Sequence, residues 1–286
     1  MTGGITFGSR TRIGRRDPRG ADRVATKRTG PERPLLATGS REKADTPAAA
    51  EPPELMLKTD LHIHTADDPR DIVTHDARAL VDRAAALGFG SLAITLHDRQ
   101  FRDSRVDDYA RERGIVLLPG VERTIHGKHV LLINFPAAAA QARTFEEVAA
   151  LKSRCNGLVI APHPFFPAPS CLAGLLDRHV DLFDAIEWTY FWLRGANFNR
   201  RAAAWAQRYG KPLVGNSDLH DLRQLGRTFS TVAAERQPDA ICEAIRQGRV
   251  SLTTSPAGYV DLALTLGGML WRGRKLPSPA AVRTAS

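Results

Sequence analysis

Two histidines one residue apart, His62 and His64, are the first residues of this chain whose spacing suggests metal chemistry. They follow a short apolar run and Asp60, a pattern typical of a β-strand. Residues i and i+2 of a strand point to the same face, so both imidazoles can reach one point in space. Chelation of a metal ion requires such convergence. The pair gains weight because similar motifs follow later in the chain.

Further histidines and carboxylates lie where later predicted strands end. They are His97 with Asp98, Glu122, His163, Glu187, and Asp218 with His220, whereas His129 opens its strand. In a (β/α) barrel the carboxyl ends of the strands converge on one face, where active sites lie. We therefore expect these side chains to meet in space although they are distant in sequence.

Histidine and carboxylate ligands without cysteine suit zinc, manganese or iron in an open, catalytic geometry. The candidates are too many for one ion of four to six ligands, so the sequence predicts two or three divalent metal ions. A carboxylate such as Glu122 can bridge two ions about 3.5–4 Å apart, the spacing used to hydrolyse phosphate esters.

Predicted strands and helices alternate from about residue 55 onward. The strands are predicted at 57–62, 91–95, 115–118, 129–134, 158–161, 185–187, 213–215 and 250–253, and the helices at 76–87, 107–113, 144–154, 172–178, 197–208 and 238–247. Thr144 is the predicted N-cap of its helix, with Glu147 at the capping-box position. This alternation favours an α/β barrel or an open parallel sheet.

Composition fits a protein of the reducing cytosol. The chain has 286 residues and 43% hydrophobic content, enough for a sizeable core, and it contains no apolar run long enough to span a membrane. Its three cysteines show no CxxC spacing, which argues against a disulfide framework. We therefore expect a cytoplasmic protein without a membrane partner.

The net charge of +9 is shared between residues 1–55 and the remainder. Residues 1–55 lack hydrophobic periodicity and an apolar core like that of a signal peptide, so we expect a disordered basic extension. This charge alone does not indicate nucleic-acid binding.

Taken in order, the motifs resemble the PHP (polymerase and histidinol phosphatase) domain family. They are Asp60-Leu61-His62-Ile63-His64-Thr65, Ile94-Thr95-Leu96-His97, Gly120-Val121-Glu122, the His129 strand, Ala161-Pro162-His163-Pro164-Phe165, and Ser217-Asp218-Leu219-His220 followed by Leu225-Gly226-Arg227. The resemblance covers about residues 57–255. It implies a distorted seven-stranded (β/α) barrel over 56–256, with a trinuclear metal centre at its carboxyl face. Residues 257–286 would form a C-terminal segment, which we expect to be partly disordered.

The resemblance also implies how the ligands are shared among three ions. One ion would take His62, His64, Glu122 and Asp218; a second would share Glu122 and take His129 and His163; a third would take His97, His220 and an acidic residue after the first motif. For that acidic residue we prefer Asp68 and keep Asp67 as the alternative, because Asp67-Asp68-Pro69 stands where the family often has Ser-Asp-Gly.

Other positions are assigned less directly. Leu96 stands where the family often has Asp, and we expect Asp98 to orient an imidazole rather than to bind metal. His126 is the alternative to His129. His75 and His179 match no motif and are interpreted as surface residues, and Glu187 is left unassigned.

Arginines near the carboxyl face are the candidates for contacting substrate, because a phosphate needs cationic partners. Arg194 lies in an aromatic loop after the sixth predicted strand, and we assign it a catalytic role. Arg99 and Arg102 follow the His97 motif, where a phosphate contact and an ordinary surface position are both open.

These features predict a metal-dependent phosphoesterase that hydrolyses a small phosphorylated metabolite or nucleotide with metal-activated water. Asp218 or a neighbouring histidine, His220, would move the proton to the leaving group. One alternative is an amidohydrolase-like enzyme that uses the same metal site. The other is a nucleic-acid-associated accessory or proofreading module, although we expect nucleic acid only as a substrate.

Overall fold

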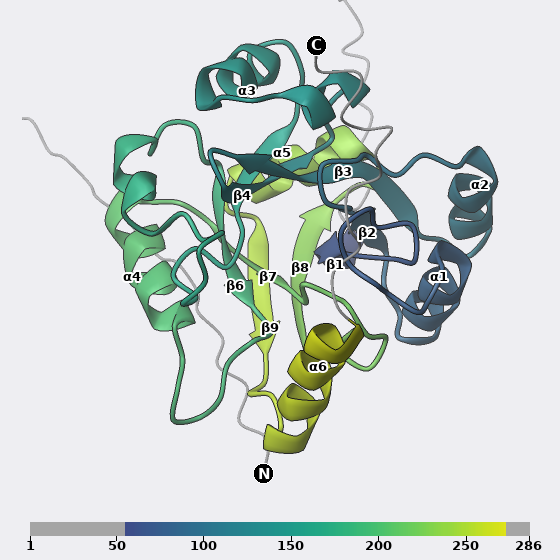
Figure 1. Ribbon diagram of the computed structural model, residues 1–286. Helices are drawn as coiled ribbons and strands as arrows, with labels where there is room; N and C mark the ends of the chain where they lie inside the picture. Colours follow the sequence, from purple (N-terminus) through teal and green to yellow (C-terminus); the bar gives the residue numbers. More distant parts are fainter. Residues whose placement is uncertain (1–54, 273–286) are drawn as a thin grey trace, which may run out of the picture. The chain divides into compact units, whose positions relative to one another are not determined.

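The computed structural model describes residues 55–272, in which a sheet of nine strands is flanked by helices (Figure 1). The strands are β1 (Leu55–Ile63), β2 (Ser91–Ile94), β3 (Val116–Ile125), β4 (Lys128–Ile133), β5 (Leu158–Ala161), β6 (Ala185–Thr189), β7 (Leu213–Asn216), β8 (Thr228–Ala234) and β9 (Val250–Thr254). The helices are α1 (Ala77–Ala86), α2 (Ser104–Glu112), α3 (Phe145–Lys152), α4 (Asn199–Tyr209), α5 (Pro238–Arg246) and α6 (Tyr259–Arg272), and the 3₁₀ segments are η1 (Ala137–Gln141) and η2 (Ala173–Arg178).

The sheet has the strand order β7-β6-β5-β4-β3-β2-β1-β8-β9 and is nearly closed into a barrel. Strands β1, β2 and β3 pair in parallel, as do β5, β6 and β7, whereas β4, β8 and β9 pair only in antiparallel fashion. Just beyond β7, Leu219 pairs with the end of β1, where its backbone exchanges hydrogen bonds with His62 and His64 at 3.1 and 2.9 Å. The predicted mixed α/β barrel is confirmed in this broad form, but the sheet has nine strands rather than the expected seven.

A tight hairpin joins β3 and β4 and explains why His129 opens its strand. The turn residues His126 and Gly127 have φ angles of 49° and 74°. Positive φ at both central positions is typical of the two-residue turns that reverse a strand with the correct twist. Because β4 runs antiparallel, its first residues lie beside the carboxyl end of β3, and His129 pairs with Thr124.

Local signals set several helix ends. The Asp76 side chain accepts a hydrogen bond from the Ala79 N–H at the start of α1. The Thr144 side chain accepts from the Glu147 N–H at the start of α3, so the predicted N-cap is confirmed. Helix α4 ends at Gly210, whose φ of 63° suits a residue without a Cβ.

Three groups of buried apolar residues hold the layers together. Helices α1 and α2 pack together on β1 and β2, α3 and α4 pack on the β4–β6 part of the sheet, and α5 packs on residues drawn from most of the strands. Figure 1 shows α1 and α2 on one side of the sheet and α4 on the other. This packing leaves the carboxyl ends of the parallel strands free to carry polar side chains.

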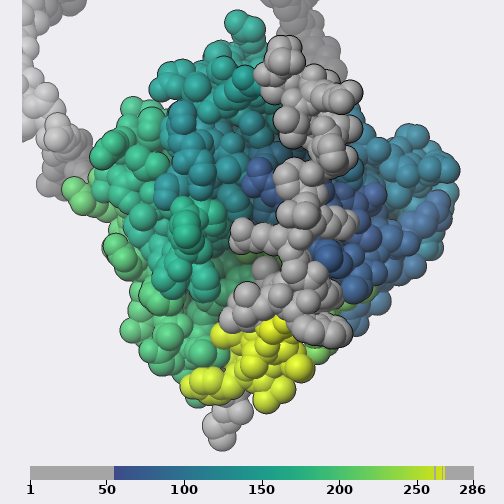
Figure 2. Space-filling view, viewed as in Figure 1, coloured from purple at the N-terminus to yellow at the C-terminus, as the bar shows by residue number. Residues whose placement is uncertain are grey.

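Two elements were not predicted. Strand β8 alternates strictly between buried and half-buried residues, but its buried positions include Thr228 and Ser230, so no apolar pattern marks it. Helix α6 lies in the predicted C-terminal segment and forms the yellow region at the surface in Figure 2. Its first residue, Tyr259, is 72% exposed.

The predicted extension at residues 1–55 lies outside the described residues except for residue 55, and so does the predicted C-terminal segment beyond residue 272. The predicted domain boundaries therefore stay a prediction. Within residues 55–272, no helix is long and apolar enough to cross a membrane.

Candidate metal centre

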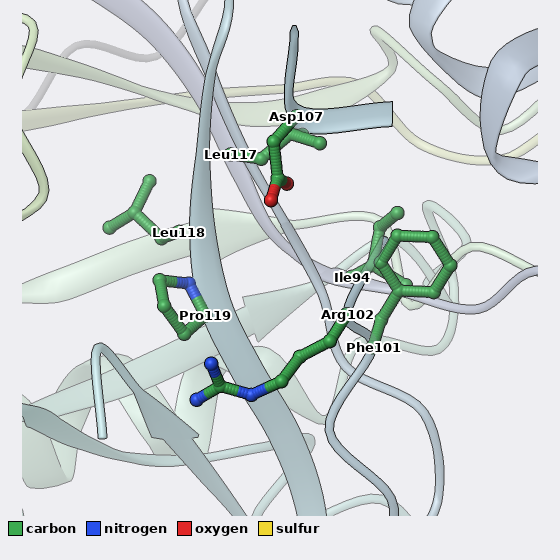
Figure 3. Close-up of a pocket in the computed structure, with 7 residues that line it drawn as sticks. All are labelled: Ile94, Phe101, Arg102, Asp107, Leu117, Leu118 and Pro119. Carbon is green, nitrogen blue, oxygen red and sulfur yellow. The ribbon is translucent and has the colours of Figure 1, made fainter. Parts of the chain in front are cut away.

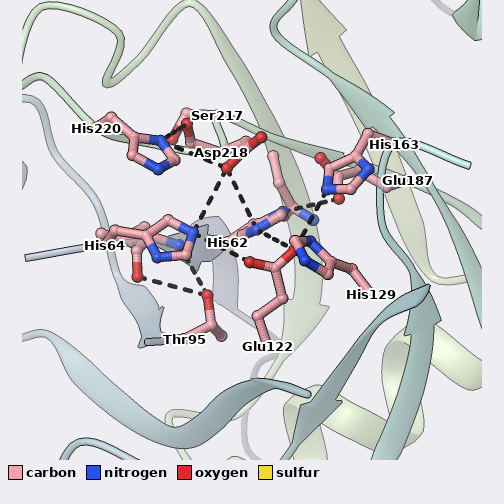
Figure 4. A network of polar contacts seen from close by, with 12 residues as sticks. His62, His64, Thr95, Glu122, His129, His163, Glu187, Ser217, Asp218 and His220 are labelled. Carbon is pink, nitrogen blue, oxygen red and sulfur yellow. Dashed lines mark hydrogen bonds and ion pairs between the residues drawn. The ribbon is translucent and has the colours of Figure 1, made fainter. Parts of the chain in front are cut away.

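His62 and His64 turn their imidazoles into the same space at the end of β1 (Figure 4). Their ring centroids lie 5.3 Å apart, and both side chains are fully buried. The Nε2 atoms of His62 and His64 lie 3.3 and 3.5 Å from the same oxygen, Oδ1 of Asp218. The His-x-His spacing thus brings two ring nitrogens to one point, as its sequence indicates.

The Glu122 carboxylate lies at the centre of a ring of imidazoles and is 1% exposed. Its Oε1 is 2.6 Å from Nδ1 of His129 and 3.3 Å from Nε2 of His163. Its Oε2 is 3.1 Å from Nε2 of His97 and 3.4 Å from Nε2 of His64. A carboxylate that presents both oxygens to separate groups of ring nitrogens is arranged to bridge two cations.

Asp68, the preferred acidic ligand for the third ion, is buried but is already occupied by protein groups. Its Oδ2 lies 2.8 Å from Nδ1 of His64 and 3.0 Å from Nδ1 of His97. Its Oδ1 accepts the backbone N–H groups of Arg70 and Asp71. These contacts orient two imidazoles, a role that differs from direct binding of an ion. The alternative, Asp67, is exposed.

Asp71 reaches the centre although the sequence analysis did not single it out. Its Oδ2 lies 3.0 Å from Nε2 of His220 and 4.0 Å from Nδ1 of His97. Among the described residues, the groups of three ligand atoms within 4.8 Å of one another do not include His220. The geometry therefore does not gather the third predicted set, and Asp71 is the carboxylate that lies nearest to His220.

Glu187 is the other contributor left unassigned by the sequence analysis. It is fully buried in β6, and its Oε2 lies 3.0 Å from Nδ1 of His62. A carboxylate on Nδ1 holds the proton on that nitrogen and leaves Nε2 with a free lone pair. The sequence signal for it was its place at the end of a predicted strand, which it shares with the other candidate residues.

We expect Glu187→Gln to weaken metal binding about 10- to 100-fold, because a neutral amide holds the His62 imidazole less firmly than a carboxylate does. Metal titration of the purified variant measures the effect. Glu235→Gln, which changes an exposed glutamate, serves as the control. Equal affinities for the two variants would rule out an orienting role for Glu187.

Charges within the cluster shift the pKa values strongly. Burial alone would raise the pKa of the Glu122 carboxyl, but the surrounding imidazoles, above all His129, hold it well below its usual range. Burial opposes protonation of His62, yet the carboxylates of Asp218 and Glu187 hold its pKa well above the usual value. Burial also opposes protonation of His97, but the nearby carboxylates, above all Glu122, raise its pKa to about 9. In this cluster the protons of the imidazoles neutralise the carboxylates. A metal cation would have to displace these protons in order to bind.

The donor set fits divalent metal ions. The Nε2 atoms of His62 and His64 are buried and make no hydrogen bond to any described residue. Four overlapping groups could hold an ion: His62, Glu122 and His163; His62, His64 and Asp218; His64, Asp68 and His97; and His97, Glu122 and His129. Buried nitrogen lone pairs without donors are costly unless a cation uses them.

Three other sequence interpretations meet different outcomes. Arg194 is exposed and forms no hydrogen bond or ion pair with the described residues, so its catalytic role stays a prediction. Asp98 does not orient an imidazole, because its carboxylate binds the guanidinium groups of Arg70 and Arg123 instead. His75 is not a surface residue: it is 7% exposed, and its Nε2 contacts the His64 carbonyl oxygen at 3.0 Å.

Two cavities lie outside the centre. The first, lined by residues of β2 and β3 together with Phe101, Arg102 and Asp107, is drawn in Figure 3 and has a volume of about 80 Å³. A larger cavity of about 490 Å³ lies along the start of α1 and α2, and Arg99 and Arg102 line it together with Asp67. Two residues that line this cavity are close in sequence to residues of the centre: Asp67 precedes Asp68, and Arg99 lies two residues after His97.

Comparisons with known proteins agree with this fold. The family model of PHP-associated sequences (PHP_C) matches residues 196–250. A two-domain protein from Bacteroides vulgatus that contains a predicted PHP-like metal-dependent phosphoesterase shares the fold with a TM-score of 0.56 and 21% identity, over 76% of this chain and 70% of that chain. No curated protein matches the chain in sequence.

Two further solved structures share the fold. PsfC from Pseudomonas syringae has a TM-score of 0.53 and 17% identity, over 76% of this chain and 97% of that chain. The lesion-specific endonuclease PfuEndoQ from Pyrococcus furiosus has a TM-score of 0.50 and 19% identity, over 68% of this chain and 56% of that chain.

The fold and the site define a mixed α/β protein with a centre lined by histidines and carboxylates. Residues 196–250 match the family model of PHP-associated sequences, and the fold is similar to that of PHP-like proteins, in line with the resemblance of the ordered motifs.

Proposed function

We propose that this protein is a metal-dependent phosphoesterase that hydrolyses a small phosphorylated metabolite or nucleotide. The observation that carries the proposal is the buried Glu122 carboxylate, whose two oxygens face separate groups of imidazole nitrogens. Such a bridging arrangement suits two or more ions that act together on a phosphoryl group. PHP-like relatives with the same fold support a hydrolase.

We assign two positions from the contacts. The first position consists of His62, His64, Glu122 and Asp218, and the second consists of Glu122, His129 and His163. A third position would use His97 and His220, with Asp71 a better placed carboxylate than Asp68. Zinc, manganese and iron all suit this mixture of nitrogen and oxygen donors.

The chemistry supplied by bound divalent cations is activation of water and neutralisation of the phosphoryl oxygens. The protein orients these groups: Glu187 fixes the His62 ring, and Asp68 fixes the rings of His64 and His97. Asp218 and His220 adjoin the first position, with Asp218 Oδ1 lying 3.6 Å from His220 Nδ1. We assign them the transfer of a proton to the leaving oxygen.

The substrate would be recognised by its charge. Arg99 and Arg102 line the 490 Å³ cavity beside the centre, and Arg194 lies in an exposed loop after β6. Guanidinium groups bind phosphate oxygens with paired hydrogen bonds, so these side chains are the proposed contacts for the non-reacting part of the substrate.

The experiment that tests the proposal combines metal analysis of the purified full-length chain with a panel of phosphomonoesters, phosphodiesters and amides. We expect at least two ions per chain and turnover of phosphate esters but not of amides. His62→Ala should lose both metal and activity, whereas the exposed control His126→Ala should keep both. Fewer than two ions, or activity that survives His62→Ala, would refute the proposal.

Removal of the metal should also lower stability, because ions that bind only the folded state stabilise it. At a free metal concentration of 100 Kd the gain is about 2.7 kcal/mol per site, or roughly 5–10 °C in Tm for a domain of this size. Thermal unfolding with and without a chelator measures the difference. The metal content of both samples is verified before unfolding. Identical Tm values for the metal-loaded and the metal-free protein would contradict a metal centre that forms only in the folded state.

A further inference from the structure

The second position differs from the rest of the centre in what holds its histidines. His62 has Glu187 on Nδ1 at 3.0 Å, and His64 has Asp68 on Nδ1 at 2.8 Å. His163 instead has the thiol of Cys171, whose Sγ lies 3.3 Å from its Nδ1. Sulfur is a much weaker hydrogen-bond acceptor than a carboxylate.

His129, the other histidine of the second position, faces Glu122 through Nδ1 at 2.6 Å. Its remaining nitrogen, Nε2, makes no hydrogen bond to any residue that the structure describes. In neither imidazole of the second position, therefore, does the ring nitrogen that points away from Glu122 contact a carboxylate. A carboxylate at that place raises the basicity of a metal-binding imidazole, so these two imidazoles are the weaker donors.

Backbone contacts fix the thiol in its place. Cys171 is 3% exposed, and its N–H donates to the Ala168 carbonyl at 3.1 Å. The next loop residue back, Ser170, accepts the His129 N–H at 2.8 Å. The loop that carries Cys171 therefore contacts both histidines of the second position, and the thiol is the side chain that meets the His163 ring.

We propose that Cys171 positions His163 within the second position, and that the ion held there is released before the ion of the first position. The inference rests on the proposed metal centre. With the metal-binding nitrogen Nε2 facing Glu122, the His163 proton lies on Nδ1 and is donated to the sulfur. A ring held by this weaker contact binds its ion less firmly than the rings backed by Glu187 and Asp68.

Stepwise removal of metal from the loaded full-length chain tests the proposal. Increasing chelator should release the ion of the second position before the ion of the first, as counted by mass spectrometry of the metal that remains with the protein. In Cys171→Ala the ion of the second position should leave about 10- to 100-fold more readily, and Cys171→Ser, whose hydroxyl can accept the same proton, should restore most of the difference. Cys242→Ala, which removes a fully buried thiol in another part of the core, is the matched control.

A second readout needs no metal. In the metal-free chain, at a pH above the raised pKa of the His163 imidazole, ¹⁵N NMR should show the His163 proton on Nδ1 in the wild type and in Cys171→Ser, and a mixture of ring tautomers in Cys171→Ala. Equal metal release from Cys171→Ala and Cys242→Ala would overturn this inference while leaving the proposed function intact. A wild-type chain that takes up no metal would overturn both.

Discussion

Glu122→Gln should nearly abolish hydrolysis and remove at least one metal ion per chain. The carboxylate has imidazole nitrogens within 3.4 Å of both oxygens, and the first and second positions share it. A neutral amide presents one oxygen and one N–H₂ group, so it cannot accept from both sides or balance two cations. We expect a loss in kcat/KM on the order of 10³-fold, which corresponds to about 4 kcal/mol of transition-state stabilisation.

Metal content and kcat/KM on the best phosphate ester measure this effect, and near-ultraviolet circular dichroism confirms that the variant is folded. The control is Glu112→Gln, which makes the same change at an exposed residue at the end of α2. A folded Glu122→Gln variant with the full complement of metal and less than a tenfold loss of activity would show that Glu122 does not bridge ions.

The residues of the centre could be predicted because metal binding constrains residue type and spacing together. His62 and His64 lie two apart on a strand, and the later histidines and carboxylates, except His129 at the start of β4, stand at the ends of strands that reach the same face. The resemblance led to His129 rather than His126, and the structure places His129 against Glu122 while His126 occupies the exposed turn. A local pattern in one sequence can thus predict which side chains gather, while the chemistry that they perform stays a proposal.

The supporting residues could not be predicted in this way, because their roles depend on contacts between distant segments. Glu187 stands at the end of a predicted strand, but its partner His62 lies 125 residues away, and Cys171 lies in an irregular loop. No local pattern therefore shows which imidazole each of them contacts. Asp71 was passed over because Asp68 matched the expected motif position, although the loop turns Asp71 toward His220. Strand β8 escaped prediction because buried hydroxyl groups replace apolar side chains at alternate positions.

The barrel is nearly closed at a seam where β7 contacts β1 and β8, and this seam links the fold to the centre. Gly215 in β7 donates its N–H to the Ser230 hydroxyl at 2.8 Å, and Asn216 accepts the Leu61 N–H at 2.9 Å. The next residues along the chain are Ser217 and Asp218, so the same seam brings Asp218 to within 3.3 Å of His62. Close packing at Gly215 therefore sets the position of a proposed metal ligand.

Gly215→Ala should accordingly destabilise the protein by about 3 kcal/mol, or roughly 6–12 °C in Tm. An added Cβ would lie 2.3 Å from Cδ1 of Leu252 and 2.8 Å from the backbone oxygen of Phe229. The leucine tip can rotate away, but the Phe229 oxygen belongs to β8 and moves only with the sheet.

Gly174→Ala is the matched control, since a Cβ there meets nothing within 4 Å, and it should change stability by less than about 0.5 kcal/mol. Denaturant unfolding of both variants measures the difference, and equal stabilities would mean that β7 does not pack against β8 and β9 as closely as the seam requires. Because the seam also places Asp218, the metal affinity of Gly215→Ala should fall together with its stability, whereas that of Gly174→Ala should not.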